Sequence, residues 1–242
     1  MRRESGFAAA AAILLLIGIA VFLIDIFCFS FSFYQKEYEK LGTAESIGMT
    51  EQSLTMATQA LLDYLRDNRD DLSVTAEIQG KVREVFNARE KQHMVDVKQL
   101  YLTARAVGYG CLALGAGCLL LLFWKAGRSK YGKEEILQGY LKGNGIFFAI
   151  LAVIGLFAAI DFDTFWTLFH KVLFTNDLWL LNPRTDILIM IVPEEFFFDL
   201  VMRIAEAAVS SIGLLLLGAW FWKKKLKKET DGKGYAEAGE TQ

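Results

Sequence analysis

The sequence predicts an all-α, polytopic membrane protein with four transmembrane helices and two extracytoplasmic helical segments. Hydrophobic residues make up 54% of its 242 residues, and the mean hydropathy of +0.31 is too high for an ordinary soluble domain. Four apolar stretches approach or exceed the length of a bilayer-spanning helix, which is about 20 residues. Lysine and arginine collect beside these stretches in a pattern that gives the spans an orientation.

The four apolar stretches contain very few charged side chains. The first has a single carboxylate, Asp25, and the fourth has Glu206 near its outer end. The first stretch is too long for the apolar part of a signal peptide, and no A-x-A-like cleavage site follows it, so we expect an uncleaved anchor. The predicted transmembrane helices are 7–33, 106–124, 145–160 and 204–222.

The basic residues predict that both termini lie in the cytoplasm. Arg2 and Arg3 precede the first span, and the predicted cytoplasmic loop 125–144 carries five basic residues against two glutamates. The fourth span is followed by KKKLKK, after which the polar tail 229–242 is expected to be disordered. The chain is therefore predicted to be a multi-pass membrane protein, with one membrane domain over residues 1–242.

The first extracytoplasmic segment, 34–105, reads as two helices. Thr50 is a candidate N-cap for the first, and the second, over about 76–105, should continue into the second span. His93 and Asp96 lie three residues apart and so share a face of that second helix. At 1.5 Å per residue His93 lies roughly 10–20 Å from the hydrocarbon. A histidine with an acid at this spacing is often only a structural pair, so a catalytic and a structural interpretation both stand.

The second extracytoplasmic segment, 161–203, is rich in aromatic residues yet interrupted by charges. This pattern favours an amphipathic helix or a segment in the lipid headgroup layer. His170 lies among aromatic residues, and a turn is expected at Asn176 and Asp177, just before Trp179. Charged residues at the start of the fourth span usually pair with each other or face a polar cavity, so either a salt bridge or a substrate contact fits. These residues are Asp199, Arg203 and Glu206.

Several other chemistries find little support. His93, His170 and Asp96 could supply three ligands to zinc, but the close-spaced His/Cys pairs of such sites are missing from the sequence, so we expect no metal. No serine stands in a nucleophile-elbow motif. The segments predicted to be cytoplasmic contain no Gly-rich phosphate loop. We therefore expect no nucleotide or nucleic acid as a partner. The cysteines, an odd number, are expected to be buried and inert: Cys28, Cys111 and Cys118.

Two motifs, together with the order of the spans, resemble the lipoprotein intramolecular transacylase (Lit) family of Gram-positive bacteria. They are HMVDVK leading into the second span, and FHKVLFTNDLWLLNP followed by TDILIMIVPEEFF. The resemblance implies an integral membrane acyltransferase without a cofactor, whose partners are membrane lipids and a diacylglyceryl-modified lipoprotein. It implies transfer of an acyl chain from the glyceryl ester to the α-amino group of the N-terminal cysteine, giving the N-acyl, S-monoacylglyceryl (lyso) form. It implies that His93 and His170 are the catalytic pair.

The chemistry suits histidine, because the α-amine, of pKa about 7.7–8.0, must lose a proton to a base. We expect His93 to be that base, held by Asp96, with His170 on the oxyanion side and the two rings converging outside the cell. The aromatic stretches 162–181 and 187–198 would hold acyl chains. Supporting or substrate-positioning roles are expected for Asp96, Asn176, Asp177, Trp179, Asp199 and Arg203.

Two rival functions remain open at this point. The protein could be another membrane lipid enzyme, either an esterase or an acyltransferase that takes its acyl chain from a phospholipid. It could instead be a non-enzymatic scaffold whose outer helices bind a partner protein. The fate of the acyl chain separates the first rival from an intramolecular transfer, and replacement of the two histidines separates the second.

Overall fold

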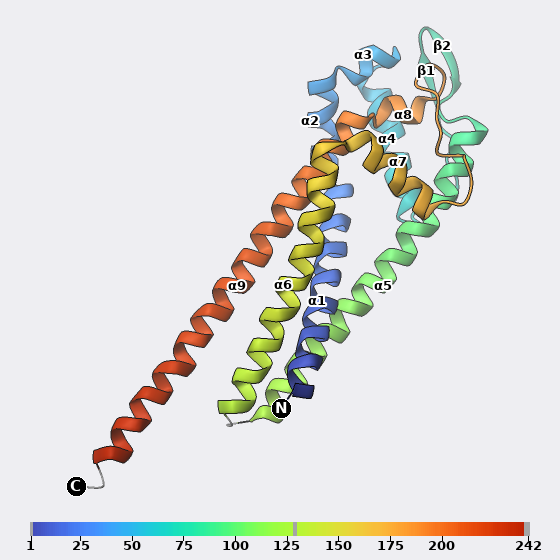
Figure 1. Ribbon diagram of the computed structural model, residues 1–242. Coiled ribbons are helices and arrows are strands. Elements are labelled where there is room, and N and C mark those ends of the chain that lie inside the picture. The colour runs from blue at the N-terminus through green and yellow to red at the C-terminus, as the bar shows by residue number, and fades with distance from the viewer. Residues whose placement is uncertain (1, 128–129, 240–242) are drawn as a thin grey trace. The chain divides into compact units, whose positions relative to one another are not determined.

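The computed structural model describes residues 2–127 and 130–239 (Figure 1). The chain divides into two compact units. Unit 1 comprises Met1–Phe22, Val107–Gly155 and Ala205–Gln242, and unit 2 comprises Leu23–Ala106 and Leu156–Ile204. Secondary structure in the described residues is helical except for one two-stranded sheet, which belongs to unit 2.

Within the described part of the chain, four helices are long and apolar enough to cross a membrane. Each contains one of the four predicted spans or most of it, so the fold class is as predicted and the chain is an integral membrane protein. The apolar part of the second of these helices is the predicted span 106–124, and its first 18 residues, 88–105, precede that span. The four helices are α1 (Arg2–Cys28), α5 (Ala88–Ala126), α6 (Lys130–Ile160) and α9 (Glu194–Gly239).

Helices in unit 1 approach each other closely at glycines. A Cβ atom built on Gly115 of α5 would lie 2.5 Å from the Leu15 nitrogen of α1, and one on Gly139 of α6 would lie 2.2 Å from the Ser5 carbonyl oxygen. Backbone at such distances leaves no room for any side chain. This is the packing expected in lipid, where small residues let helix backbones come together.

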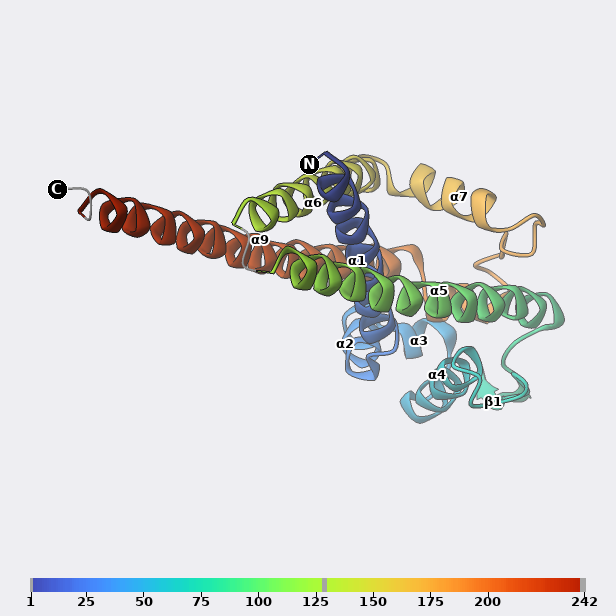
Figure 2. The same cartoon turned by 90° about the horizontal axis from the view of Figure 1, so that it is seen from below.

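Unit 2 holds the main hydrophobic core. Aromatic and aliphatic side chains from the helices and the sheet form it, with Phe86, Phe196 and Ile47 fully buried at its centre. The shorter helices and the strands of unit 2 are seen in Figures 1 and 2. They are α2 (Phe31–Leu41), α3 (Thr43–Ile47), α4 (Glu51–Leu65), β1 (Thr75–Ile78), β2 (Lys81–Glu84), α7 (Phe162–Leu173) and α8 (Ile187–Ile191). Thr50 caps α4 as predicted, since its hydroxyl oxygen accepts from the Ser53 amide.

The prediction of a helix over 76–105 is wrong for residues 76–87. Residues 75–84 form an antiparallel hairpin instead, and α5 begins at Ala88. The reason is the turn: Gln79 and Gly80 have φ of 54° and 77°, the left-handed conformation at both central residues that two-residue hairpin loops need.

The ends of two other segments also differ from expectation. The first span was expected to reach residue 33, but α1 ends at Cys28, and Phe31 opens α2 after the extended Ser30. The tail 229–242 was expected to be disordered, but α9 continues as far as Gly239. Glu, Ala and Lys, which are strong helix formers, supply five of the eleven residues in 229–239. The last three residues of the tail lie outside the described part.

Candidate active site

His93 is fixed by the way α5 begins. Asn87 and Glu90 form a reciprocal cap, in which the Asn87 side-chain oxygen accepts from the Glu90 amide and the Glu90 carboxylate accepts from the Asn87 amide at 2.6 Å. The other Glu90 oxygen accepts from the Leu188 amide at the start of α8. His93 follows Glu90 by one turn and is 6% exposed. The cap therefore sets both the start of the helix and the place of the imidazole.

His170 lies on α7, whose N-cap is Asp161. Its Nδ1 lies 2.8 Å from the Trp166 carbonyl oxygen one turn earlier. A carbonyl oxygen can only accept, so Nδ1 carries the hydrogen, and Nε2 of the neutral ring has a free lone pair. Trp179, from the turn after α7, stacks on the ring at 4.9 Å between centroids. These contacts fix both the tautomer and the plane of His170.

The two imidazoles lie together within unit 2. Their centroids are 6.2 Å apart, with 38° between the ring planes. Phe174, the residue after α7, contacts both, at 5.2 Å from His93 and 5.7 Å from His170. The convergence of the two rings, expected from the sequence, is thus present in the structure.

Burial keeps both rings uncharged at neutral pH. Desolvation, and after it the neighbouring His170, lower the pKa of His93 to about 4, although the Asp96 carboxylate acts in the opposite direction. Desolvation also lowers the pKa of His170, against the hydrogen bond to Trp166. Both imidazoles are therefore neutral at pH 7, the state in which each can accept a proton.

Nδ1 of His93 is a buried nitrogen with no hydrogen-bond partner in the described part of the chain. Buried polar atoms are nearly always paired, and an unpaired one in a native structure needs an explanation. A substrate atom that completes this hydrogen bond is such an explanation, since the nitrogen lies beside a second histidine.

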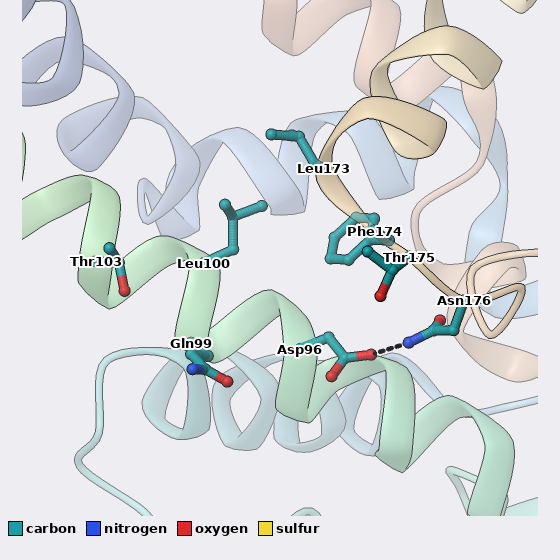
Figure 3. Close-up of a pocket in the computed structure, with 8 residues that line it drawn as sticks. All are labelled: Asp96, Gln99, Leu100, Thr103, Leu173, Phe174, Thr175 and Asn176. Atoms are coloured by element: carbon teal, nitrogen blue, oxygen red, sulfur yellow. Dashed lines mark hydrogen bonds between the residues drawn. The ribbon is translucent and has the colours of Figure 1, made fainter.

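Asp96 does not hold His93 as we expected. Its carboxylate accepts from the Asn176 side-chain amide at 2.9 Å (Figure 3). The two residues belong to α5 and to the turn after α7, and together they form one wall of a pocket of about 270 Å³. The sequence placed Asp96 and His93 on one helix face, but it could not show that a loop far along the chain supplies a competing donor.

Three other predicted residues contact protein groups rather than open space. The Asp177 carbonyl oxygen accepts from the Arg89 guanidinium, and the Asp199 carboxylate accepts from Lys40. The Arg203 guanidinium lies 5.4 Å from the ring centroids of both Phe27 and Phe33. These contacts favour structural roles. Asp199 forms a salt bridge with Lys40 rather than with Arg203, and Arg203 contacts two aromatic rings.

Sequence reasoning missed Glu90 and Phe174. Glu90 could have been found, because Asn87 followed three residues later by a glutamate is a capping signature. Phe174 gave no signal, since one more phenylalanine in an aromatic stretch does not stand out. As for metals, the described residues contain no group of three or more His, Cys, Asp or Glu side chains placed to bind one.

Known proteins with a similar fold have been solved. Solved structures of the membrane integral lipoprotein intramolecular transacylase Lit from Bacillus cereus are similar to the chain; one has a TM-score of 0.73 at 21% identity, covering 95% of this chain and 97% of that one. A variant of that protein with one histidine changed to alanine gives a TM-score of 0.71 at 21% identity, covering 94% and 95%. A variant with a histidine changed to arginine gives 0.64 at 22% identity, covering 96% and 92%.

These structural likenesses establish the fold. No curated protein sequence matches the chain. The family model described as lipoprotein intramolecular transacylase Lit matches residues 9–197, well over half of the sequence. The chain therefore belongs to the lipoprotein intramolecular transacylase (Lit) family.

Proposed function

We propose that this protein catalyses an intramolecular acyl transfer on diacylglyceryl-modified lipoproteins. The acyl chain moves from the glyceryl ester to the α-amino group of the N-terminal cysteine and leaves the N-acyl, S-monoacylglyceryl form. Membership of an acyltransferase family supports the reaction class. The observation that carries the proposal is the pair of buried, neutral histidines 6.2 Å apart on two separate helices.

The contacts of the two rings favour the opposite assignment of the base and the oxyanion donor from the one expected from the sequence. In His170 the lone pair of Nε2 is free, because Nδ1 donates to the Trp166 carbonyl oxygen. We therefore assign the base to His170. His93, with its unpaired Nδ1, is assigned to the carbonyl oxygen, to which an Nδ1–H group would donate.

The step balances without any co-reactant. The amine nitrogen bonds to the ester carbonyl carbon while His170 takes a proton from it, and His93 donates to the developing oxyanion. The bond from that carbon to the glyceryl oxygen then breaks, and His170 returns the proton to the glyceryl oxygen. Donor and acceptor belong to one molecule, so the protein has to supply geometry and proton transfer rather than an energy source.

The distribution of charge supports an orientation with both termini in the cytoplasm and the histidine pair outside the cell. The predicted loop 125–144 and the start of the tail are strongly basic, whereas 161–203 has few basic residues. An extracytoplasmic site matches a substrate whose lipid is anchored in the outer leaflet. It also matches a reaction that needs no nucleotide.

Mass spectrometry of lipoproteins from cells with and without the gene tests the proposal. We expect one acyl chain to move to the amine within the same molecule when the protein is present. His93→Gln and His170→Gln should each lower the conversion roughly 10²–10⁴-fold, the usual contribution of general acid–base help. Lys171→Gln, next to His170 but exposed, serves as the control that retains activity.

The same measurement separates the rival functions. Loss of an acyl chain from the product would indicate hydrolysis, and a gain of mass would indicate a phospholipid donor. If both histidine variants accumulate normally and leave the lipid forms unchanged, these histidines are not catalytic. A scaffold would instead respond to substitutions on the exposed face of 51–66.

A further inference from the structure

A pocket of about 270 Å³ lies between one face of α5 and the end of α7 (Figure 3). Phe174 lines this pocket and also contacts both imidazoles, so one side chain links the pocket to the histidine pair. The residues that line it are Asp96, Gln99, Leu100, Thr103, Leu173, Phe174, Thr175 and Asn176.

Asp96 is the one charged residue among these eight, and only one of its two carboxylate oxygens accepts a hydrogen bond from the described residues. One oxygen, Oδ2, accepts from Asn176, and this is the only hydrogen bond that the Asp96 side chain makes within residues 2–127 and 130–239. The donor is a neutral amide, so the negative charge is held in place without being neutralised. The remaining polar groups of the pocket, on Gln99, Thr103 and Thr175, can all accept hydrogen bonds.

The charges around the pocket favour a cation. Both histidines are neutral, because burial lowers the pKa of each. Arg89, one turn before His93, is engaged by the Asp177 carbonyl oxygen. No basic residue lines the pocket among the described residues, so a positive group would meet one fixed carboxylate and several neutral acceptors there.

We propose that this pocket binds the α-ammonium group of the substrate, with Asp96 as its counter-ion and Asn176 as the residue that orients Asp96. The inference rests on the proposed acyl transfer, which requires an N-terminal amine beside the histidines. With a pKa of about 7.7–8.0, that amine reaches the site mostly protonated at neutral pH. An ammonium has three N–H donors, and the pocket offers the charged and neutral acceptors to match them.

This role of Asp96 predicts different effects on KM and on kcat. Asp96 stabilises the ammonium form, which tightens binding but also makes the bound amine a weaker acid. Removal of the carboxylate should therefore raise KM roughly tenfold or more, as for a charge-assisted hydrogen bond. It should not lower kcat at neutral pH, and the rise of kcat with pH should move to lower pH. A residue that merely stabilised the fold or tuned His93 would not divide its effects in this way.

Binding of two matched lipopeptides tests the proposal directly. One is an S-diacylglyceryl-cysteinyl peptide with a free α-amine, and the other is its N-acetylated twin, which has no charge there. Affinities are measured in detergent on His170→Gln protein, so that no turnover occurs. We expect a preference of roughly tenfold for the free amine, and we expect that preference to disappear in Asp96→Asn while binding of the acetylated twin is unchanged.

Two further variants and a pH series serve as controls for this binding measurement. Asp96→Glu retains the charge and should retain part of the preference. Asp70→Asn removes an exposed carboxylate from the segment before β1 and should behave as the parent. On the unaltered pocket the preference should fade as the pH rises beyond the pKa of the free amine, which tests the idea even if Asp96→Asn fails to fold.

A preference that survives Asp96→Asn, or that does not depend on pH, would overturn the inference. So would an equal loss of affinity for both lipopeptides, since that is the behaviour of a structural residue. The proposed function fails separately, if the unaltered protein forms no lyso product although its preference for the free amine still depends on Asp96.

Discussion

His170 and His93 are the same residue type in two different electrostatic and hydrogen-bonding settings. One ring is anchored by a backbone carbonyl and a stacked tryptophan, and the other is buried with one nitrogen unpaired. This difference assigns the base to His170 and the oxyanion donor to His93, which the sequence alone could not do. Both motifs contain a histidine near an aspartate or asparagine, and only the folded contacts show which nitrogen is occupied.

The low pKa of His93 should make the protein less stable in mild acid. The folded value is about 4 and the ordinary value is 6.5, so between these the unfolded chain binds more protons. Stability therefore rises with pH across this window and is lost as the pH falls from 6.5 toward 4. We expect the thermal midpoint in detergent to drop over this range, and to drop less in His93→Gln. Equal slopes for the two proteins would show that His93 titrates normally.

Glu90 should be the most sensitive polar residue near the site. It is 1% exposed and accepts from the amides of Asn87 and Leu188, which joins the start of α5 to α8. Glu90→Ala removes the acceptor of both donors and leaves the buried Leu188 amide unpaired, at a cost of about 2–4 kcal/mol of unfolding free energy. Its thermal midpoint should fall by several degrees. Glu84→Gln, which loses only the exposed ion pair with Lys91, is the control and should change stability by less than about 1 kcal/mol.

At the scale of elements, the lengths of the apolar stretches were enough to predict the four long helices, because lipid leaves no other way to satisfy a spanning backbone. The hairpin was missed for an equally physical reason. Ile78, Val82, Val85 and Phe86 have a spacing that fits a helix as well as a strand pair. Only the left-handed backbone at Gln79 and Gly80 decides between them, and Gln79 gives no sign of it in the sequence.

The contact between α1 and α5 in unit 1 should tolerate no side chain at Gly115. A Cβ there would lie 2.5 Å from the Leu15 nitrogen and 2.8 Å from the Ala11 carbonyl oxygen, so the helices would have to move apart. We expect Gly115→Ala to cost about 1–3 kcal/mol, as overpacking usually does. The measurement is the thermal midpoint and the yield of monodisperse protein in detergent.

Gly117 provides the matched control for this helix contact. It lies two residues further along α5, and a Cβ there would have nothing within 4 Å. Gly117→Ala should be neutral or should stabilise by up to about 1 kcal/mol, since alanine is the better helix former. Equal effects of the two substitutions would mean that helix propensity, and not the approach of α1, decides the result.

For the whole molecule, the sequence predicted the number of spans and the two histidines, but not the pocket. Spans and basic clusters are local features that can be read directly from the chain. The pocket combines α5 with a turn some 80 positions later, and the Asp96–Asn176 hydrogen bond that shapes it exists only after folding. The resemblance to the Lit family identified the histidines, and the structure added which groups surround them.

The orientation of the whole molecule is the prediction with the widest consequence, because it decides whether the site can reach its substrate. Val82, 78% exposed in β2, belongs to the segment that should be outside the cell, and Lys125, at the end of α5, should face the cytoplasm. On a background with Cys28, Cys111 and Cys118 replaced by serine, a membrane-impermeant maleimide should label Val82→Cys in intact cells. It should label Lys125→Cys only after lysis. The reverse pattern would place the histidine pair on the cytoplasmic side, where a lipoprotein already anchored in the outer leaflet could not reach it, and the proposed reaction would lose its substrate.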